Sequence, residues 1–185
     1  MDTRLLIILG LVVIAAVIAA FLIIRKRNSD RLRSRFGPEY KVAVEEAGGH
    51  RKAEALLHDR EKRVKGFHVT PLRTEDRDRY IVAWRRTQAE FVDDPKAAVA
   101  HADALLGEVM SARGYPVTDF EQRSADLSVD HPVVVQNYRA AHDVAVRHER
   151  GEAGTEDLRQ AMIHYRALFE DLVEVDEPPS LKAAS

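Results

Sequence analysis

The sequence lacks several residue types and motifs on which enzyme sites are commonly built. None of its 185 residues is a cysteine, which excludes disulfides, thiolate metal sites and cysteine nucleophiles. It also has no glycine-rich phosphate loop, no HExxH segment and no Glu-x-x-His segment. P-loop and dinucleotide-binding folds, helix-borne zinc sites and four-helix carboxylate sites are therefore without support. We assign no catalytic residue, no metal ligand and no cofactor from the sequence.

The sequence also lacks the alternation of apolar and polar residues that marks half-buried strands. Apolar residues recur instead at intervals of three and four, the period of one helix face. This pattern predicts an all-α fold: one N-terminal transmembrane helix followed by a compact domain of about six helices. The predicted parts are an anchor (1–24), a basic juxtamembrane segment (25–35), an all-α soluble domain (36–173) and a disordered tail (174–185).

One long apolar run stands out near the N-terminus. From Leu5 to Ile24, the segment "LLIILGLVVIAAVIAAFLII" has twenty residues without a charge or a hydroxyl. As a helix it would span ~30 Å, the thickness of the hydrocarbon core of a bilayer. A cleaved signal peptide is the alternative, but its apolar region is shorter and its basic residues come first. We predict a retained anchor, and small-xxx-small spacing of its alanines leaves a homodimer through this helix open.

Basic residues cluster directly after the apolar run. The segment 25–35 has a local charge of +5, from a single Asp30 and six basic residues: Arg25, Lys26, Arg27, Arg31, Arg33 and Arg35. The positive-inside rule places the following domain in the cytoplasm, at a bacterial inner membrane, and the six side chains would face the membrane surface. Because the whole chain carries −2 and residues 1–4 are neutral overall, the part after residue 35 carries −7. Such an acidic domain is unsuited to nucleic acid.

Prolines, glycines and capping residues set the expected helix boundaries. Asp94 is expected to cap a helix with Pro95 in its first turn. Thr118 and Glu121 match a capping box, and Thr155 is expected to cap the last helix at its start. Helices are expected over residues 38–47, 50–66, 73–92 and 94–114, from residue 118, over 132–151 and from residue 155.

Helical spacing also identifies the expected core. Two apolar seams run along the helices that begin near Asp94 and Thr155. Trp84, the only tryptophan, is interpreted as a core residue rather than as a ligand platform, on one buried face with Tyr80, Gln88 and Phe91. The other expected core positions are Val99, Ala102, Leu106, Val109, Tyr138, Leu158, Met162, Tyr165, Phe169 and Leu172.

The segment "LSVDHPVVVQNYRAAHDVAVRH" (127–148) concentrates residue types found in hydrolase triads. Neighbours in one turn cannot place a histidine between the other two members of a triad. Pro132 disfavours a helical conformation at His131, so we predict that a helix starts at Pro132. Asp130 is expected to cap it, with Ser128 and His131 as alternatives. His142 would lie ~16 Å further along that helix, too far to share a metal ion with His131. His131, His142 and His164 remain functional candidates.

The stretches "RSRFGPEY", "FVDDPKAAVAHADALL", "RGYPVTDFEQRSADLSVDHPVVVQNYRAAH" and "TEDLRQAMIHYRALF" together resemble a family of short bacterial proteins. That family has a single-pass membrane segment, sometimes labelled secreted, and an all-helical domain, with no assigned activity. The resemblance implies a bacterial origin and the anchor-plus-helices layout. It transfers no site residue.

These observations favour a membrane-anchored, cytoplasm-facing helical module that binds another protein as an adaptor or scaffold. The expected partners are the lipid bilayer and a protein that the sequence does not identify. One alternative is a membrane-tethered enzyme with a site between helices that draws on the three histidines. Another is a sensor of anionic lipid surfaces acting through residues 25–35.

Overall fold

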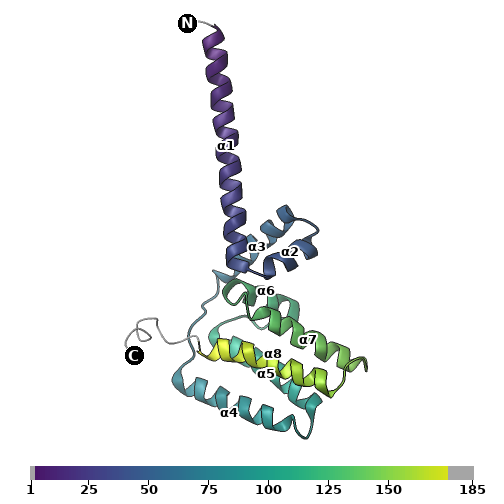
Figure 1. Ribbon diagram of the computed structural model, residues 1–185. Coiled ribbons are helices and arrows are strands. Elements are labelled where there is room, and N and C mark those ends of the chain that lie inside the picture. Colours follow the sequence, from purple (N-terminus) through teal and green to yellow (C-terminus); the bar gives the residue numbers. More distant parts are fainter. Residues whose placement is uncertain (1–2, 175–185) are drawn as a thin grey trace, which may run out of the picture. The chain divides into compact units, whose positions relative to one another are not determined.

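The computed structural model describes the backbone of residues 3–174 and the side chains of residues 11–173. This part of the chain consists of helices and their connections and contains no strand (Figure 1). The predicted all-α fold class is confirmed. The helices are α1 (Thr3–Phe36), α2 (Glu39–Ala47), α3 (His50–Val64), α4 (Thr74–Glu90), α5 (Pro95–Arg113), α6 (Phe120–Asp130), α7 (Val135–Glu149) and α8 (Thr155–Glu174).

The domain organisation differs from the predicted one. The chain divides into two compact units, Met1–Leu57 and His58–Ser185, and the division falls within α3. We predicted one domain over residues 36–173 with about six helices, whereas seven helices follow α1 in the described residues. The boundary moves because α2 packs against α1, which joins residues 39–47 to the N-terminal unit.

The backbone of α1 continues without a break through the predicted boundary between residues 24 and 25. The segment "RKRNSDRLRSRF" contains neither proline nor glycine, and the first helix breakers after it are Gly37 and Pro38. The basic segment is therefore part of this helix. Within the residues that the structure describes, no helix is both long and apolar enough to cross a membrane.

Polar contacts of Tyr40 organise the N-terminal unit. Its hydroxyl donates to Glu54 at 3.1 Å, and its ring stacks on His50 with a centroid distance of 6.1 Å. The guanidinium of Arg33 lies 5.2 Å from the centre of the same ring. One tyrosine from α2 thereby links the end of α1 to the start of α3.

The C-terminal unit is built around α8. This helix packs against α5 and α7, and α5 packs in turn against α4 (Figure 1). The ten expected core side chains, Tyr80 and Trp84 are all buried, as predicted. Gln88 and Phe91, expected on the same face as Trp84, are only half-buried. The 3.6-residue period of the apolar seams is sufficient to identify these positions, because each seam has only one way to face the core.

Gly114 ends α5 in a conformation that only glycine adopts readily. Its φ is +99°, and a Cβ atom here would lie 2.3 Å from the backbone oxygen of His68. The amide of Thr70 donates to the carbonyl of Arg113 at 2.8 Å. The connection between α3 and α4 is therefore held directly against the end of α5.

Two of the expected N-terminal caps can be compared directly with the structure. The carboxylate of Asp94 accepts from the amide of Ala97 at 2.9 Å, as predicted for α5. At α6 the cap is Asp119, which accepts from the amide of Gln122 at 2.9 Å, and not Thr118. An ionised carboxylate is favoured over a hydroxyl at this position because it also interacts with the positive end of the helix dipole.

The predicted helix start at Pro132, with Asp130 as its cap, is wrong. Asp130 is the last residue of α6, His131 follows in the connection, and α7 begins only at Val135. Asp130 instead accepts from the hydroxyl of Tyr115 at 3.1 Å. The cap position of α7 is Val134, which provides no side-chain hydrogen bond. The tertiary contact of Asp130 thus replaces the local capping role.

The last helix begins at Thr155 as predicted, but the side-chain bond at this end comes from another residue. Asp157 accepts from the amide of Gly154 at 2.8 Å. Because the carbonyl of Gly154 accepts the first helical bond, from the amide of Leu158 at 3.1 Å, Gly154 occupies the cap position and Thr155 is the first helical residue. Of the predicted tail, Glu174 ends α8, and residues 175–185 lie outside the described residues.

Candidate functional site

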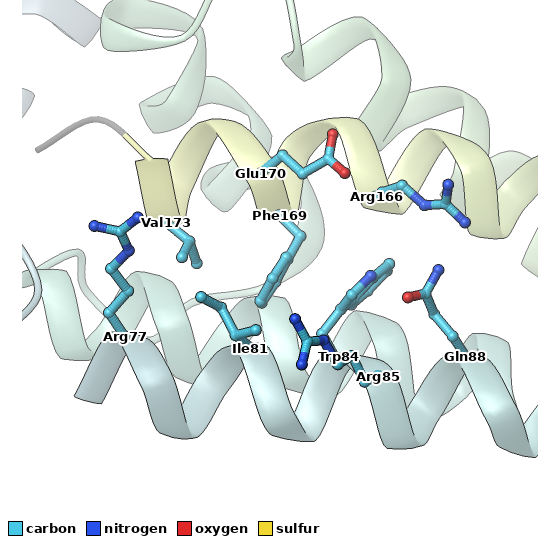
Figure 2. A pocket seen from close by; sticks show the side chains of 9 residues that line it. All are labelled: Arg77, Ile81, Trp84, Arg85, Gln88, Arg166, Phe169, Glu170 and Val173. Atoms are coloured by element: carbon cyan, nitrogen blue, oxygen red, sulfur yellow. The ribbon is translucent and has the colours of Figure 1, made fainter. Parts of the chain in front are cut away.

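A groove of about 350 Å³ lies between α4 and α8 in the C-terminal unit (Figure 2). Its α4 wall spans residues 77 to 88, ~16 Å along the helix axis. The α8 wall spans residues 166 to 173. The lining residues are Arg77, Ile81, Trp84, Arg85, Gln88, Arg166, Phe169, Glu170 and Val173.

Two stacked aromatic rings form the floor of the groove. Trp84 and Phe169 have a centroid distance of 4.7 Å and an interplanar angle of 14°. Both side chains are buried, at 5% and 3% exposure. Because the surrounding core fixes both rings in place, they present a rigid apolar surface to the groove. The prediction that Trp84 is a core residue is confirmed, and the same ring also lines the groove.

Three arginines surround this floor. Arg77 and Arg85 come from α4, and Arg166 comes from α8, near Gln88 (Figure 2). Among the described residues, none of these guanidiniums forms an ion pair or a side-chain hydrogen bond. The one acidic lining residue is Glu170, whose carboxylate points away from α4 in Figure 2. The groove is therefore cationic although the protein after residue 35 is acidic.

Other arginines of the same helix region behave differently. Arg73 and Arg79 lie 2.8 Å and 3.2 Å from the carboxylate of Asp76. Arg79 also lies 5.0 Å from the centre of the Tyr80 ring. A carboxylate is thus available on α4, but it pairs with arginines outside the groove. The guanidinium donors of the three groove arginines are therefore available to a bound group.

The side chains of the groove suit the recognition of a charged group. Arginine presents a planar fork of donors that matches carboxylate and phosphate oxygens, and a buried tryptophan is a common anchor of protein interfaces. Among the described residues, no group of three histidine, aspartate or glutamate side chains is placed to hold a metal ion. The arginines and the stacked rings together offer binding of an anionic group next to an apolar one.

The six basic residues predicted to face the membrane surface all project from α1 and are exposed: Arg25, Lys26, Arg27, Arg31, Arg33 and Arg35. Their position on a continuous helix keeps them close to the apolar run. Their interaction with lipid stays a prediction.

The three candidate histidines have three separate partners. His131, which is buried, contacts the carboxylate of Asp171 through Nδ1. His142 stacks on Phe120 at a centroid distance of 3.5 Å. His164 lies 3.0 Å from the side-chain oxygen of Asn137.

The positions of these partners show that the three histidines do not lie together. Asp171 and His164 are separated by ~10 Å along α8, and Asn137 and His142 point ~140° apart around α7. The geometry therefore gives no support to one site that joins the three histidines. His131 also lies in the connection before α7. Our prediction that His131 and His142 lie along one helix is therefore wrong.

A buried polar cluster between α5, α6, α7 and α8 is a second feature that the sequence did not indicate. Arg123 lies 3.6 Å from Asp103, and its guanidinium is 5.9 Å from the centre of the Tyr138 ring. The hydroxyls of Tyr138 and Tyr165 are buried without a hydrogen-bond partner among the described residues. Burial, and then the charge of Asp103, raise the pKa of both tyrosines above the ordinary range.

Sequence reasoning missed the groove, although one signal was present. Arg77, Ile81, Trp84, Arg85 and Gln88 recur at helical spacing, so the two cations share the face of the only tryptophan. The α8 wall could not be added, because nothing in the sequence pairs residues 77–88 with residues 166–173.

Comparisons with protein-family models, with curated proteins and with solved structures give no significant match to this chain. The resemblance to short bacterial membrane proteins therefore stays a prediction.

Proposed function

We propose that this protein is a single-pass membrane protein whose helical C-terminal unit binds another protein through the groove between α4 and α8. In this role it acts as an adaptor or scaffold and not as an enzyme. The observation that carries the binding role is the cationic groove: three arginines without a described carboxylate partner around the stacked rings of Trp84 and Phe169.

The membrane location is supported by the apolar side chains of α1. All large apolar side chains from Leu11 to Ile24 are 54% to 67% exposed. The apolar run itself begins at Leu5, six residues before the first described side chain. Exposed apolar area costs ~25 cal/mol per Å² in water, so a helix that is apolar on every side favours a lipid environment.

The orientation of the proposed span follows from charge. The basic segment 25–35 would stay on the cytoplasmic side of a bacterial inner membrane, next to anionic headgroups. The C-terminal unit would then be cytoplasmic. Two such spans could also associate through Ala15, Ala16, Ala19 and Ala20, which would give a homodimer.

The membrane part of the proposal is tested by fractionation of cells that express the full chain or a chain without residues 5–24. We expect the full chain to stay in the membrane pellet after high-salt and alkaline washes, and the deletion variant to lose this attachment. Release of the full chain by either wash would contradict the transmembrane anchor.

The binding part is tested by site-specific photocrosslinking in native membranes. A photoreactive side chain at Gln88, in the groove, should give adducts of defined mass. The same group at Val82, which is 64% exposed on α4 outside the groove, serves as the matched control. Absence of adducts from both positions, or equal adducts from both, would contradict a protein-binding groove.

A second function, the sensing of anionic lipid, is favoured by the exposure of all six basic residues of segment 25–35. It predicts binding to vesicles that contain phosphatidylglycerol, and a loss of binding as salt shortens the screening length to less than ~8 Å. Binding that is independent of salt would contradict it.

A further inference from the structure

We propose that the groove between α4 and α8 binds an acidic segment of a partner protein, with two carboxylates that flank an apolar side chain. This inference rests on the proposed function and identifies the chemistry of the partner. The argument uses the charge of the groove, the spacing of its arginines and the nature of its floor.

Charge complementarity selects an anionic occupant. The groove residues Arg77, Arg85 and Arg166 carry three positive charges, and Glu170 carries one negative charge. No described carboxylate neutralises the three arginines, although Asp76 pairs with two other arginines within three residues of it. An occupant that supplies carboxylates would satisfy the free donors and would gain from the charge excess.

The spacing of the cations indicates how the carboxylates are placed. Arg77 and Arg85 are eight residues apart on α4, which is ~12 Å along its axis. A partner helix that lies along α4 would present carboxylates at the same interval if they were eight residues apart. Arg166, on the opposite wall, is placed to contact the same segment from α8 (Figure 2).

The floor selects an apolar group between the carboxylates. The Trp84–Phe169 stack lies between the ends of the α4 wall, and half-buried Ile81 adjoins it. An aliphatic side chain midway between two carboxylates would reach this surface. An amphipathic helix in a groove between two helices is an established mode of peptide recognition.

The chain carries its own reporter for this binding. Trp84 is the only tryptophan, and it lies in the floor of the groove. Intrinsic fluorescence of the full chain in detergent micelles therefore measures occupancy of the groove. The probe is a synthetic sixteen-residue helix-forming peptide without tryptophan, with two glutamates eight residues apart and a leucine midway between them.

We expect this peptide to change the emission of Trp84 saturably, and a peptide with glutamines in place of the glutamates to bind at least about tenfold more weakly. Arg85→Glu should weaken binding of the glutamate peptide by about tenfold, because it replaces an attraction with a repulsion. Arg86→Glu is the matched control: it makes the same change at the next residue of α4, which is exposed and does not line the groove. Its affinity should equal that of the unmodified chain.

A charge swap keeps the test independent of folding. A peptide with lysines in place of the glutamates should bind Arg85→Glu more tightly than it binds the unmodified chain. Equal affinity of the glutamate and glutamine peptides, or equal losses in Arg85→Glu and Arg86→Glu, would overturn the inference.

Other occupants give different results. Inorganic phosphate that produces the same change in emission and displaces the peptide would assign the groove to a small anion. Binding that appears only after removal of residues 175–185 would assign it to the chain's own acidic end. Either result overturns the inference.

Failure of the inference is distinguishable from failure of the proposed function. Crosslinking from Gln88 that survives Arg85→Glu would leave the adaptor role in place and remove the acidic partner.

Discussion

The two longest helices, α1 and α8, are both rich in apolar residues but differ in how these residues are distributed. In α8 the large apolar side chains from Leu158 to Leu172, apart from Ile163, form one seam and are buried. In α1 the large apolar side chains between Leu11 and Ile24 surround the helix, and all are exposed. A seam can be covered by neighbouring helices, whereas a fully apolar surface needs an apolar environment on every side. The distribution of apolar residues, more than their number, separates the core helix from the proposed membrane helix.

The largest expected difference comes from the same substitution in the two helices. Leu168→Ala in α8 removes a side chain with no exposed area and should lower the free energy of unfolding by about 2–5 kcal/mol. Leu22→Ala in α1, where the leucine is 56% exposed, should change it by less than about 0.5 kcal/mol. Urea unfolding in detergent, followed by circular dichroism and Trp84 emission, measures both. Similar losses from the two variants would contradict the distinction between the helices.

Alkaline pH should weaken the C-terminal unit through the tyrosines buried against α8. Burial raises the pKa of Tyr165 and Tyr138, so the folded state keeps their protons where the unfolded state loses them. Stability is therefore unaffected below about pH 10 and falls above it, by up to ~1.4 kcal/mol per pH unit for each tyrosine.

Urea unfolding between pH 8 and 11.5 measures this decline. Tyr165→Phe should make this decline shallower, because it removes one of the two buried hydroxyls. Tyr138→Phe should have the same effect and provides an independent repeat. A decline that is unchanged in both variants would show that other groups cause it.

A smaller effect is expected from the polar contact that joins the α6–α7 connection to α8. His131 is buried, and its partner Asp171 is about one-third exposed. His131→Ala should destabilise the unit by about 1 kcal/mol, since Asp171 can be rehydrated once its partner is lost. A double-mutant cycle with Asp171→Asn isolates the interaction, and a coupling energy of zero would mean that the contact contributes nothing.

The parts of the fold that local rules determine were predictable. Asp94, Pro95 and Gly114 mark the limits of α5 because capping, a fixed φ and a left-handed terminus each depend on one residue. The seams of α5 and α8 follow from helical periodicity alone. These features require no knowledge of distant residues.

The boundary between α6 and α7 was not predictable in the same way. Asp130 binds the hydroxyl of Tyr115, and Ser128 accepts a hydrogen bond of 3.4 Å from Arg60. These partners lie 15 and 68 residues away, so the capping rules could not include them. The groove escaped prediction for the same reason: its two walls are more than 70 residues apart in the sequence.

Substituted-cysteine labelling tests the central claim most directly, because the natural chain contains no cysteine. Ser34→Cys, at an exposed position of the basic segment, and Ile18→Cys, in the apolar run, are treated with a membrane-impermeant maleimide in sealed inner-membrane vesicles. Our account predicts that Ser34→Cys is labelled in inside-out vesicles only and that Ile18→Cys is labelled in neither orientation. Labelling of Ile18→Cys in sealed vesicles of either orientation would contradict it. Labelling of Ser34→Cys in right-side-out vesicles would also contradict it.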